Sequence, residues 1–492
     1  MNQDELGVVF PATKDGRRST SALGRGVVAD ALRAVDPVGA LGAEREADWR
    51  SGYLVHFRHL VEAGLGSRQG AVTIARDGLE SVHRRMRVVH PDGDEADLSE
   101  LRSAPPVRKL RTAVVEGRAE PESEVSVPYG NDVLRGDGLL RRVDAWVEQG
   151  VVEPSCADVI GEVVRHPEWL TLPDHTVVVL GAGAEMGPLP VLLRWGCTVA
   201  GVDLPRPALW DRVIRTARGC AGRLLLPIGD DAPDEGGDDV LAQHAGLNLI
   251  AEVPEAAEWI SPLEGDLVLG NYAYADGATH VRVAVAVDAL AQRLRADRRD
   301  LSFASLATPT DVFAVPKEAV DHSVAAYATA RGKLIRRSLR VVSGGRLLRR
   351  TYLPGVDPGI NDSMVPQQGP NYALAKRIQR WRATAARADG ATVSMNVAPS
   401  TRTRSVVKNR VLAAAYAGAH RFGVEVFDPK TSNALMAALL VHDLHTGGGP
   451  RHEHPWQDEA YAAAHGGLWR TPYAPRSSFG IAALLGRGAV RA

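Results

Sequence analysis

A tyrosine and a lysine stand four residues apart in the segment Tyr372-Ala-Leu-Ala-Lys376. On a helix, this spacing places the phenol and the ammonium group on one face. A neighbouring cation lowers the pKa of a phenol, so a tyrosine in such a pair can exchange a proton with a substrate oxygen. The same spacing also arises by chance on protein surfaces, so the interpretation depends on where the pair lies in the chain.

A glycine-rich turn follows a β-branched run that begins at residue 175 and precedes a segment with helical periodicity. Glycines at such a turn let the backbone approach a pyrophosphate, and the helix that follows aims its N–H groups at the negative charge. The turn residues expected to bind a cofactor are Gly181, Gly183, Ala184, Met186 and Gly187.

An acidic residue accompanies this turn: Asp203 lies 22 residues after Gly181, at the expected end of the next strand. A carboxylate there accepts hydrogen bonds from an adenosine ribose and repels a 2′-phosphate, which favours NAD over NADP. Arg206, three residues further on, leaves NADP open. Methyltransferases that use S-adenosylmethionine also combine a glycine-rich first turn with an acid after the second strand, so the turn alone does not exclude them.

The Tyr372–Lys376 pair opens a predicted helix after the fifth predicted strand, and the segment 393–403 follows that helix. Taken in this order, the motifs of roughly residues 174–445 resemble the short-chain dehydrogenase/reductase family. The resemblance implies that Tyr372 is the general acid/base and that Lys376 lowers its pKa and holds the nicotinamide ribose. It further implies that the cofactor is contacted by Asp230, Asn271, Ala273, Pro399 and Thr403.

The serine that this family uses to position the substrate oxygen is displaced here. The family has it 12–14 residues before the tyrosine, where this chain has Pro-Gly-Ile at 358–360. Ser363 is the nearer hydroxyl along the chain, whereas Ser305 lies in the fifth predicted strand, where the family's serine belongs. We expect Ser305 to take the role, with Ser363 as the second candidate.

Two polar clusters follow the fourth and fifth predicted strands, at residues 276–282 and 308–311. In an open parallel sheet, ligands bind in the crevice at the carboxyl ends of the strands. These clusters are therefore expected to line a pocket, unless they only cap the helices that follow them.

The elements that must position these residues alternate between strands and helices from residue 174 onward. The alternation predicts an α/β fold with a Rossmann-type doubly wound parallel sheet over residues 171–445. Residues 1–170 are expected to be a mainly helical region. An insertion at about 312–365 is expected to hold a helix and a small hairpin, and residues 446–492 to form an extended C-terminal arm.

The composition indicates which partners and which cellular compartment to expect. The 58 Lys and Arg residues nearly balance the 59 Asp and Glu residues, which argues against nucleic-acid binding. No apolar run is long enough to span a membrane, no secretory signal opens the chain, and the three cysteines lack metal or redox spacing. These features predict a cytoplasmic protein. Four histidines cluster on either side of the start of the C-terminal arm, but no cysteine or carboxylate pattern completes a metal site: His442, His445, His452 and His454.

The sequence therefore predicts an NAD(P)-dependent oxidoreductase that interconverts a carbonyl and an alcohol. A catalytically silent nucleotide-binding scaffold and an S-adenosylmethionine-dependent methyltransferase are the alternatives. The large segments outside the motif-bearing core suggest a small-molecule substrate that is long or bulky, or a homo-oligomer interface.

Overall fold

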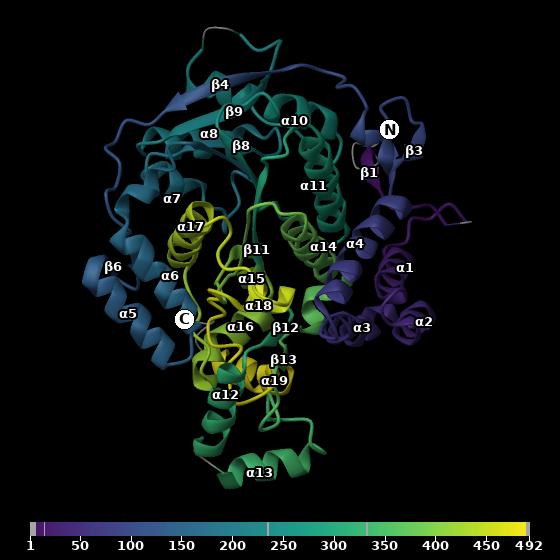
Figure 1. The fold of residues 1–492 in the computed structure, drawn as a ribbon, viewed down its shortest axis with the longest axis vertical. Helices are drawn as coiled ribbons and strands as arrows, with labels where there is room; N and C mark the ends of the chain where they lie inside the picture. The colour runs from purple at the N-terminus through teal and green to yellow at the C-terminus, as the bar shows by residue number, and fades with distance from the viewer. Residues whose placement is uncertain (1–5, 14, 234–235, 331–332, 489–492) are drawn as a thin grey trace.

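A seven-stranded sheet forms the centre of the computed structural model, which describes residues 6–13, 15–233, 236–330 and 333–488 (Figure 1). The strands lie side by side in the order β14-β11-β10-β7-β8-β9-β4. Their bounds are β14 (Val393–Val397), β11 (Ser302–Ala307), β10 (Asp266–Asn271), β7 (His175–Leu180), β8 (Thr198–Val202), β9 (Arg223–Gly229) and β4 (Leu110–Glu116).

Six of these strands are parallel, and β4 pairs antiparallel with β9 at one edge. After β4, the chain adds β7 at the centre and then β8 and β9 between β7 and β4, and it crosses to the other side of β7 to add β10, β11 and β14. The direction in which successive strands are added to the sheet thus reverses between β7 and β10.

Helices cover both faces of the sheet, because successive side chains of each strand point to opposite sides. Val178 and Leu180 of β7 belong to one buried cluster, whereas Val177 and Val179 belong to another. The first cluster includes α1 (Thr20–Arg33), α2 (Pro37–Arg45), α3 (Trp49–Gly64), α4 (Arg68–Arg85), α10 (Val253–Ile260), α11 (Ala278–Asp297) and α14 (Gly369–Ala388). The second includes α5 (Gly136–Glu148), α6 (Pro154–Arg165), α7 (Leu189–Arg194), α8 (Pro207–Arg218), α9 (Asp238–His244) and α17 (Pro429–His445).

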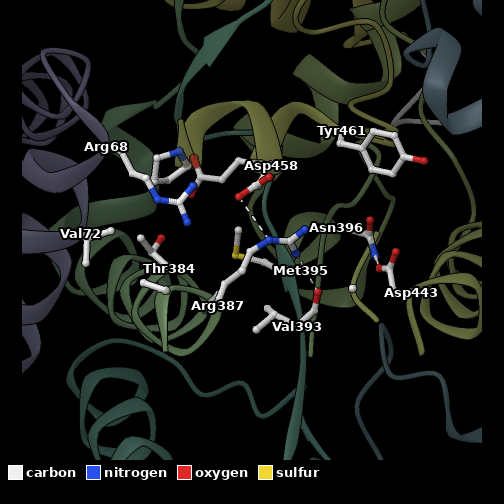
Figure 2. Close-up of a pocket in the computed structure, with 15 residues that line it drawn as sticks. Arg68, Val72, Thr384, Arg387, Val393, Met395, Asn396, Asp443, Asp458 and Tyr461 are labelled. Atoms are coloured by element: carbon white, nitrogen blue, oxygen red, sulfur yellow. Dashed lines mark hydrogen bonds and ion pairs between the residues drawn. The ribbon is translucent and has the colours of Figure 1, made fainter. Parts of the chain in front are cut away.

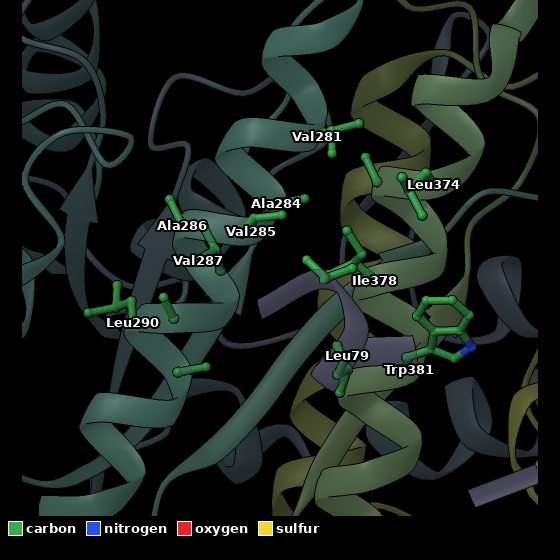
Figure 3. Packing of buried hydrophobic residues seen from close by; sticks show 14 of the residues in the cluster. Leu79, Val281, Ala284, Val285, Ala286, Val287, Leu290, Leu374, Ile378 and Trp381 are labelled. Atoms are coloured by element: carbon green, nitrogen blue, oxygen red, sulfur yellow. The ribbon is translucent and has the colours of Figure 1, made fainter. Parts of the chain in front are cut away.

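The N-terminal helices pack directly on the helices of the sheet. Figure 3 shows Leu79 of α4 beside Ile378 and Trp381 of α14. Gly78 permits this approach, because a Cβ atom there would lie 2.5 Å from the Trp381 ring. Residues 1–170 also supply β4, the sheet edge, and a small sheet of β1 (Gly7–Val9), β2 (Arg87–Val89) and β3 (Glu95–Asp97). The proposed boundary near residue 170 stays a prediction.

The insertion after β11 differs from the expectation. β12 (Val312–Val315) pairs with the distant β13 (Gly359–Asp362), and α12 (Lys317–Thr329) and α13 (Lys333–Val342) lie between them. The hairpin expected near residues 339–353 was wrong, because the helix continues to Val342 and the Gly344-Gly345 pair ends it with left-handed φ angles of +60° and +79°. In Figure 1, α13 lies at the far end of the molecule from β4.

The C-terminal segment is more ordered than the expected extended arm. It contains α18 (Pro455–Ala460) and α19 (Pro475–Gly486), and its Trp469 is fully buried. The carboxylate of Glu153, at the start of α6, accepts hydrogen bonds from Arg470 and contacts His465 at 2.9 Å. The segment is thus attached to the helical region. Within the described residues, no helix combines the length and the apolar character needed to cross a membrane.

Candidate active site at the carboxyl edge of the sheet

The motifs singled out in the sequence meet at one edge of the sheet, because parallel strands share the edge at which they end. The glycine turn follows β7, Asp203 follows β8, Asp230 follows β9, Asn271 ends β10, and Pro399 follows β14. This edge includes the point between β7 and β10 where the direction of building reverses, which is the usual ligand site of open α/β sheets.

The glycine turn lies against the loop that follows β10. Gly181 has a φ of +91°, and a Cβ atom at this position would lie 3.0 Å from the backbone of Ala273. Glycine is therefore required both by the backbone conformation and by the close approach. The turn closes through hydrogen bonds from the Ala184 N–H to the Gly181 carbonyl oxygen and from the Gly187 N–H to the Ala184 carbonyl oxygen. Met186 is half-buried and packs against the second cluster.

Asp203 lies beside this turn, at the place expected for it. Its carboxylate accepts hydrogen bonds from the backbone N–H of Gly183 at 2.9 Å and of Leu204 at 2.8 Å. Burial raises the pKa of Asp203 in spite of these bonds and of the positive charges of Arg206 and Arg212. Arg212 was not foreseen from the sequence; it lies on α8, and its guanidinium donates to the Gly183 carbonyl oxygen.

Tyr372 and Lys376 lie on α14, over the end of β11. The Lys376 ammonium group donates to the carbonyl oxygen of Leu306 at 3.3 Å and to Gln379 Oε1 at 3.0 Å. A hydrogen bond joins the side chains of Tyr372 and Thr308, which belongs to the second predicted polar cluster. The helix therefore brings the pair to the carboxyl edge.

The charge state of this pair differs from the expectation. Burial raises the pKa of Tyr372, and the hydrogen bond with Thr308 offsets only part of that effect. The pKa of Tyr372 is therefore raised, and not lowered as expected, because the phenol is largely buried; the catalytic role of the pair stays a prediction. Burial lowers the pKa of Lys376 to about 8, against the opposing charge of Asp311.

An aromatic cluster surrounds the Tyr372 side chain. The ring of His280, in the first turn of α11, lies 5.5 Å from that of Tyr372, and both approach Tyr274. His280 belongs to the first predicted polar cluster and Thr308 to the second, so residues of both clusters lie beside Tyr372, and their place in a pocket stays a prediction. Tyr416 of α16 (Arg410–Gly418) lies close enough for its phenol to be influenced by Tyr372.

The two candidate serines occupy different places. Ser363 is fully buried beside the β12–β13 pair, where its hydroxyl donates to Asn361 Oδ1 at 2.5 Å. Ser305 stands opposite Asn271 in the register of β11 and β10, and both line a cavity between the sheet and helices α11 and α14. Asn271 Oδ1 has no hydrogen-bond partner among the described residues. Neither serine has a hydrogen bond to Tyr372.

The loop expected to face the nicotinamide reaches both the aromatic cluster and the glycine turn. Thr403 shares a hydrogen bond with Ser405, and Ser405 is hydrogen-bonded to Tyr274. Pro399 is buried, and its carbonyl oxygen accepts from Thr401. Two helices follow this loop: Asn409 separates α15 (Arg404–Lys408) from α16.

Glu185 of the glycine turn forms a hydrogen bond with the loop after β14, a contact that was not predicted from the sequence. Its carboxylate accepts from the Arg404 N–H at 2.8 Å, and its carbonyl oxygen accepts from Asn433 of α17 at 2.9 Å. Only the fold brings these distant segments together. Asp230, expected to contact the cofactor, is exposed after β9, two strands away from β7.

A second pocket lies beside β14 (Figure 2). Its charged groups already have protein partners: Arg387 pairs with Asp458 at 3.2 Å, and Asp443 accepts from Ser394 and Asn396. Three of the clustered histidines, His442, His445 and His452, are engaged by protein groups, whereas Nδ1 of His454 has no partner among the described residues. No set of three or more side chains that could hold a metal ion occurs within the described residues.

Comparison with known proteins gives little further information. No model of a known protein family matches the chain, and no curated protein matches it. Among solved structures, it is similar to a thiolation-reductase di-domain from an archaeal non-ribosomal peptide synthetase, with 11% sequence identity and a TM-score of 0.27. The match covers 50% of this chain and 47% of that chain, so it spans about half of each.

Proposed function

We propose that this chain is an NAD(P)-dependent oxidoreductase that interconverts a carbonyl and an alcohol, built on a doubly wound Rossmann-type sheet. The observation that carries the proposal is that the glycine turn meets the loop after β10, at the reversal point, while Tyr372 lies beside the loops after β10 and β11 at the same carboxyl edge. A parallel sheet whose strands run in this order binds dinucleotides across that crevice.

The residues at this edge fit a nicotinamide dinucleotide. The turn from Gly181 to Gly187 offers a close backbone approach for a pyrophosphate, and Asp203 lies where a ribose would be held. Arg206 and Arg212 carry positive charge near that carboxylate and provide partners for a 2′-phosphate, so both NAD and NADP suit the site. The cofactor, when bound, supplies or accepts a hydride.

The state of Tyr372 suits it as a general acid. Because burial raises its pKa, the phenol carries its proton at neutral pH, and reduction of a carbonyl requires a proton donor at the oxygen. Lys376 places an amino group on the same helix face one turn away, with Thr308 as the direct hydrogen-bond partner of Tyr372.

A cofactor-binding scaffold without turnover is the second candidate. Two observations favour it. The Ser363 hydroxyl already donates to Asn361 and so does not position a substrate oxygen, and both carboxylate oxygens of Asp203 already accept backbone N–H groups. The methyltransferase alternative gains no support of this kind.

A binding titration combined with one substitution tests the proposal. We expect calorimetry to detect binding of NADH or NADPH to the purified chain and none of S-adenosylmethionine. Tyr372→Phe should keep that affinity while kcat/KM for carbonyl reduction falls by about 100-fold or more. Tyr129→Phe, a control whose neighbours are Trp146 and Glu425, should change neither quantity.

The two candidate functions give different results. Cofactor binding without reduction of benzaldehyde, octanal or cyclohexanone would favour the scaffold. Binding of S-adenosylmethionine with no binding of either nicotinamide cofactor would refute the oxidoreductase.

A further inference from the structure

His280 is a buried polar residue whose hydrogen-bonding groups are unused. Its side chain is 1% exposed, and neither Nδ1 nor Nε2 has a partner among the described residues. Buried polar atoms in proteins are almost always hydrogen-bonded, and an unpaired one costs free energy. An imidazole with both nitrogens unpaired therefore calls for an explanation other than packing.

The surroundings of His280 place it at the reacting end of the proposed site. Its ring centroid lies 5.5 Å from that of Tyr372 and 5.0 Å from that of Tyr274. Tyr274 is 51% exposed, so the cluster reaches the surface at that residue. The positive charge of Lys376 acts on the His280 ring as well.

These neighbours fix the form of the imidazole. Burial, assisted by the charge of Lys376, lowers the pKa of His280 to about 3. The ring is therefore neutral at neutral pH, with one N–H donor and one nitrogen acceptor. A neutral donor can polarise a carbonyl oxygen without a change of charge on the protein.

Neither candidate serine supplies such a donor beside Tyr372, and the Thr308 hydroxyl there is already engaged by Thr310 and Tyr372. Ser363 is bound to Asn361, and Ser305 lies within the cavity beneath α11 and α14. We propose that His280 donates the hydrogen bond that binds the oxygen of the reacting carbonyl group, next to the Tyr372 hydroxyl. This assignment rests on the proposed function and replaces Ser305 and Ser363 in that role.

The walls of the site also indicate the substrate class. Tyr274, His280 and Tyr372 form an uncharged aromatic surface, and Lys376 brings a cationic amino group close to it. Planar rings stack favourably on such walls, whereas a cationic ligand would be repelled. This aromatic surface therefore suits an uncharged aryl aldehyde or aryl ketone.

Variants of His280 separate this role from packing. If the imidazole served only to fill space, His280→Leu would leave reduction of benzaldehyde unchanged. We expect instead that His280→Leu lowers kcat/KM for benzaldehyde about 100-fold, as loss of an oxyanion donor does. Its affinity for NADH or NADPH should stay within about twofold, and its thermal midpoint should equal or exceed that of the wild type, because an unsatisfied polar group has been removed.

Two further variants complete the experiment. His280→Gln keeps an N–H donor and should recover about tenfold of the lost kcat/KM. His175→Leu is the matched control: His175 also has a lowered pKa and an unpartnered Nδ1, but it starts β7 at the opposite edge of the sheet. It should retain wild-type kcat/KM.

The outcomes distinguish the two proposals. Wild-type kcat/KM in His280→Leu, or equal losses in His280→Leu and His175→Leu, overturns the role of His280 while leaving the oxidoreductase intact. Cofactor binding without reduction of benzaldehyde or acetophenone overturns the aryl-carbonyl assignment. Failure of the wild-type chain to bind either nicotinamide cofactor overturns the proposed function and, with it, the role of His280.

Discussion

Lys376 holds its amino group against two neutral oxygens, those of the Leu306 backbone carbonyl and the Gln379 side chain. Burial lowers its pKa from 10.5 to about 8. Between these two pH values the unfolded chain binds more protons than the folded chain, so this group makes the free energy of unfolding rise with pH. At neutral pH, the folded protein therefore bears the cost of a buried charge.

Replacement of this lysine by Met should remove that cost. We expect the free energy of unfolding of Lys376→Met, relative to the wild type, to be about 3 kcal/mol higher at pH 7 than at pH 10.5. Urea unfolding at both pH values measures the difference. The exposed Lys408→Met serves as control and should show no such change. If the difference in free energy of unfolding between Lys376→Met and the wild type did not change with pH, the lowered pKa of Lys376 would be contradicted.

The sequence could identify Tyr372 and Lys376 because spacing on one helix is a local property. It could not predict the direction of the Tyr372 pKa, because the groups around the phenol come from Tyr274, His280 and Tyr416, which lie far apart in the chain. The role now proposed for His280 depends on unpaired nitrogens, which only the packed structure reveals.

At the scale of elements, helices α4, α11 and α14 are joined by one buried carboxylate. Asp288 of α11 accepts two hydrogen bonds from Arg382 of α14, at 2.7 and 2.9 Å, and contacts His83 of α4 at 2.7 Å. Burial opposes ionisation of Asp288, but these partners outweigh it and hold its pKa well below the ordinary value. The interaction fixes the N-terminal helices on the helix that carries Tyr372.

Asp288→Asn should therefore destabilise the chain strongly. The substitution leaves the Arg382 cation buried without its carboxylate, and breaking a buried pair in this way costs about 3–5 kcal/mol. Chemical denaturation measures the loss, and Asp297→Asn, at the exposed end of the same helix, should cost little. An unchanged unfolding midpoint for Asp288→Asn would show that the pair does not hold the helices together.

Elements that depend on local pattern were predicted, and those that depend on distant partners were not. The six parallel strands β7, β8, β9, β10, β11 and β14 were recognised because each is a short apolar run followed by a turn. β4 was missed because its strand forms only through pairing with β9, which lies more than a hundred residues away in the chain. The hairpin near residue 345 was mispredicted because Gly344 and Gly345 suit a strand turn and a helix end equally well.

At the scale of the whole molecule, the first buried cluster extends from Val8 to Val393 and includes side chains from both the N-terminal helices and the sheet. The C-terminal segment is held by a second connection. Glu153 bonds to Arg470 and His465 through its carboxylate, and its N–H donates to the Ala463 carbonyl oxygen. The segment therefore depends on an ionised group that lies more than three hundred residues earlier in the chain.

Acid should release this connection. Burial raises the pKa of Glu153, but hydrogen bonds from Arg470 and His465 outweigh burial and lower it from 4.5 to about 2. A carboxylate whose folded pKa is lowered stabilises the protein above pH 4.5, and this contribution is lost as the pH falls through 2. Glu153→Gln should therefore be less stable than the wild type by about 3 kcal/mol at pH 6, with a smaller gap at pH 2. Thermal unfolding across this pH range, with the exposed Glu148→Gln as control, measures the difference in stability between Glu153→Gln and the wild type. A difference that stays constant with pH would mean that Glu153 acts through its shape and not its charge.

Limited proteolysis at pH 6 should cut Glu153→Gln first within residues 446–488, because the loss of one carboxylate frees the segment that Arg470 and His465 anchor.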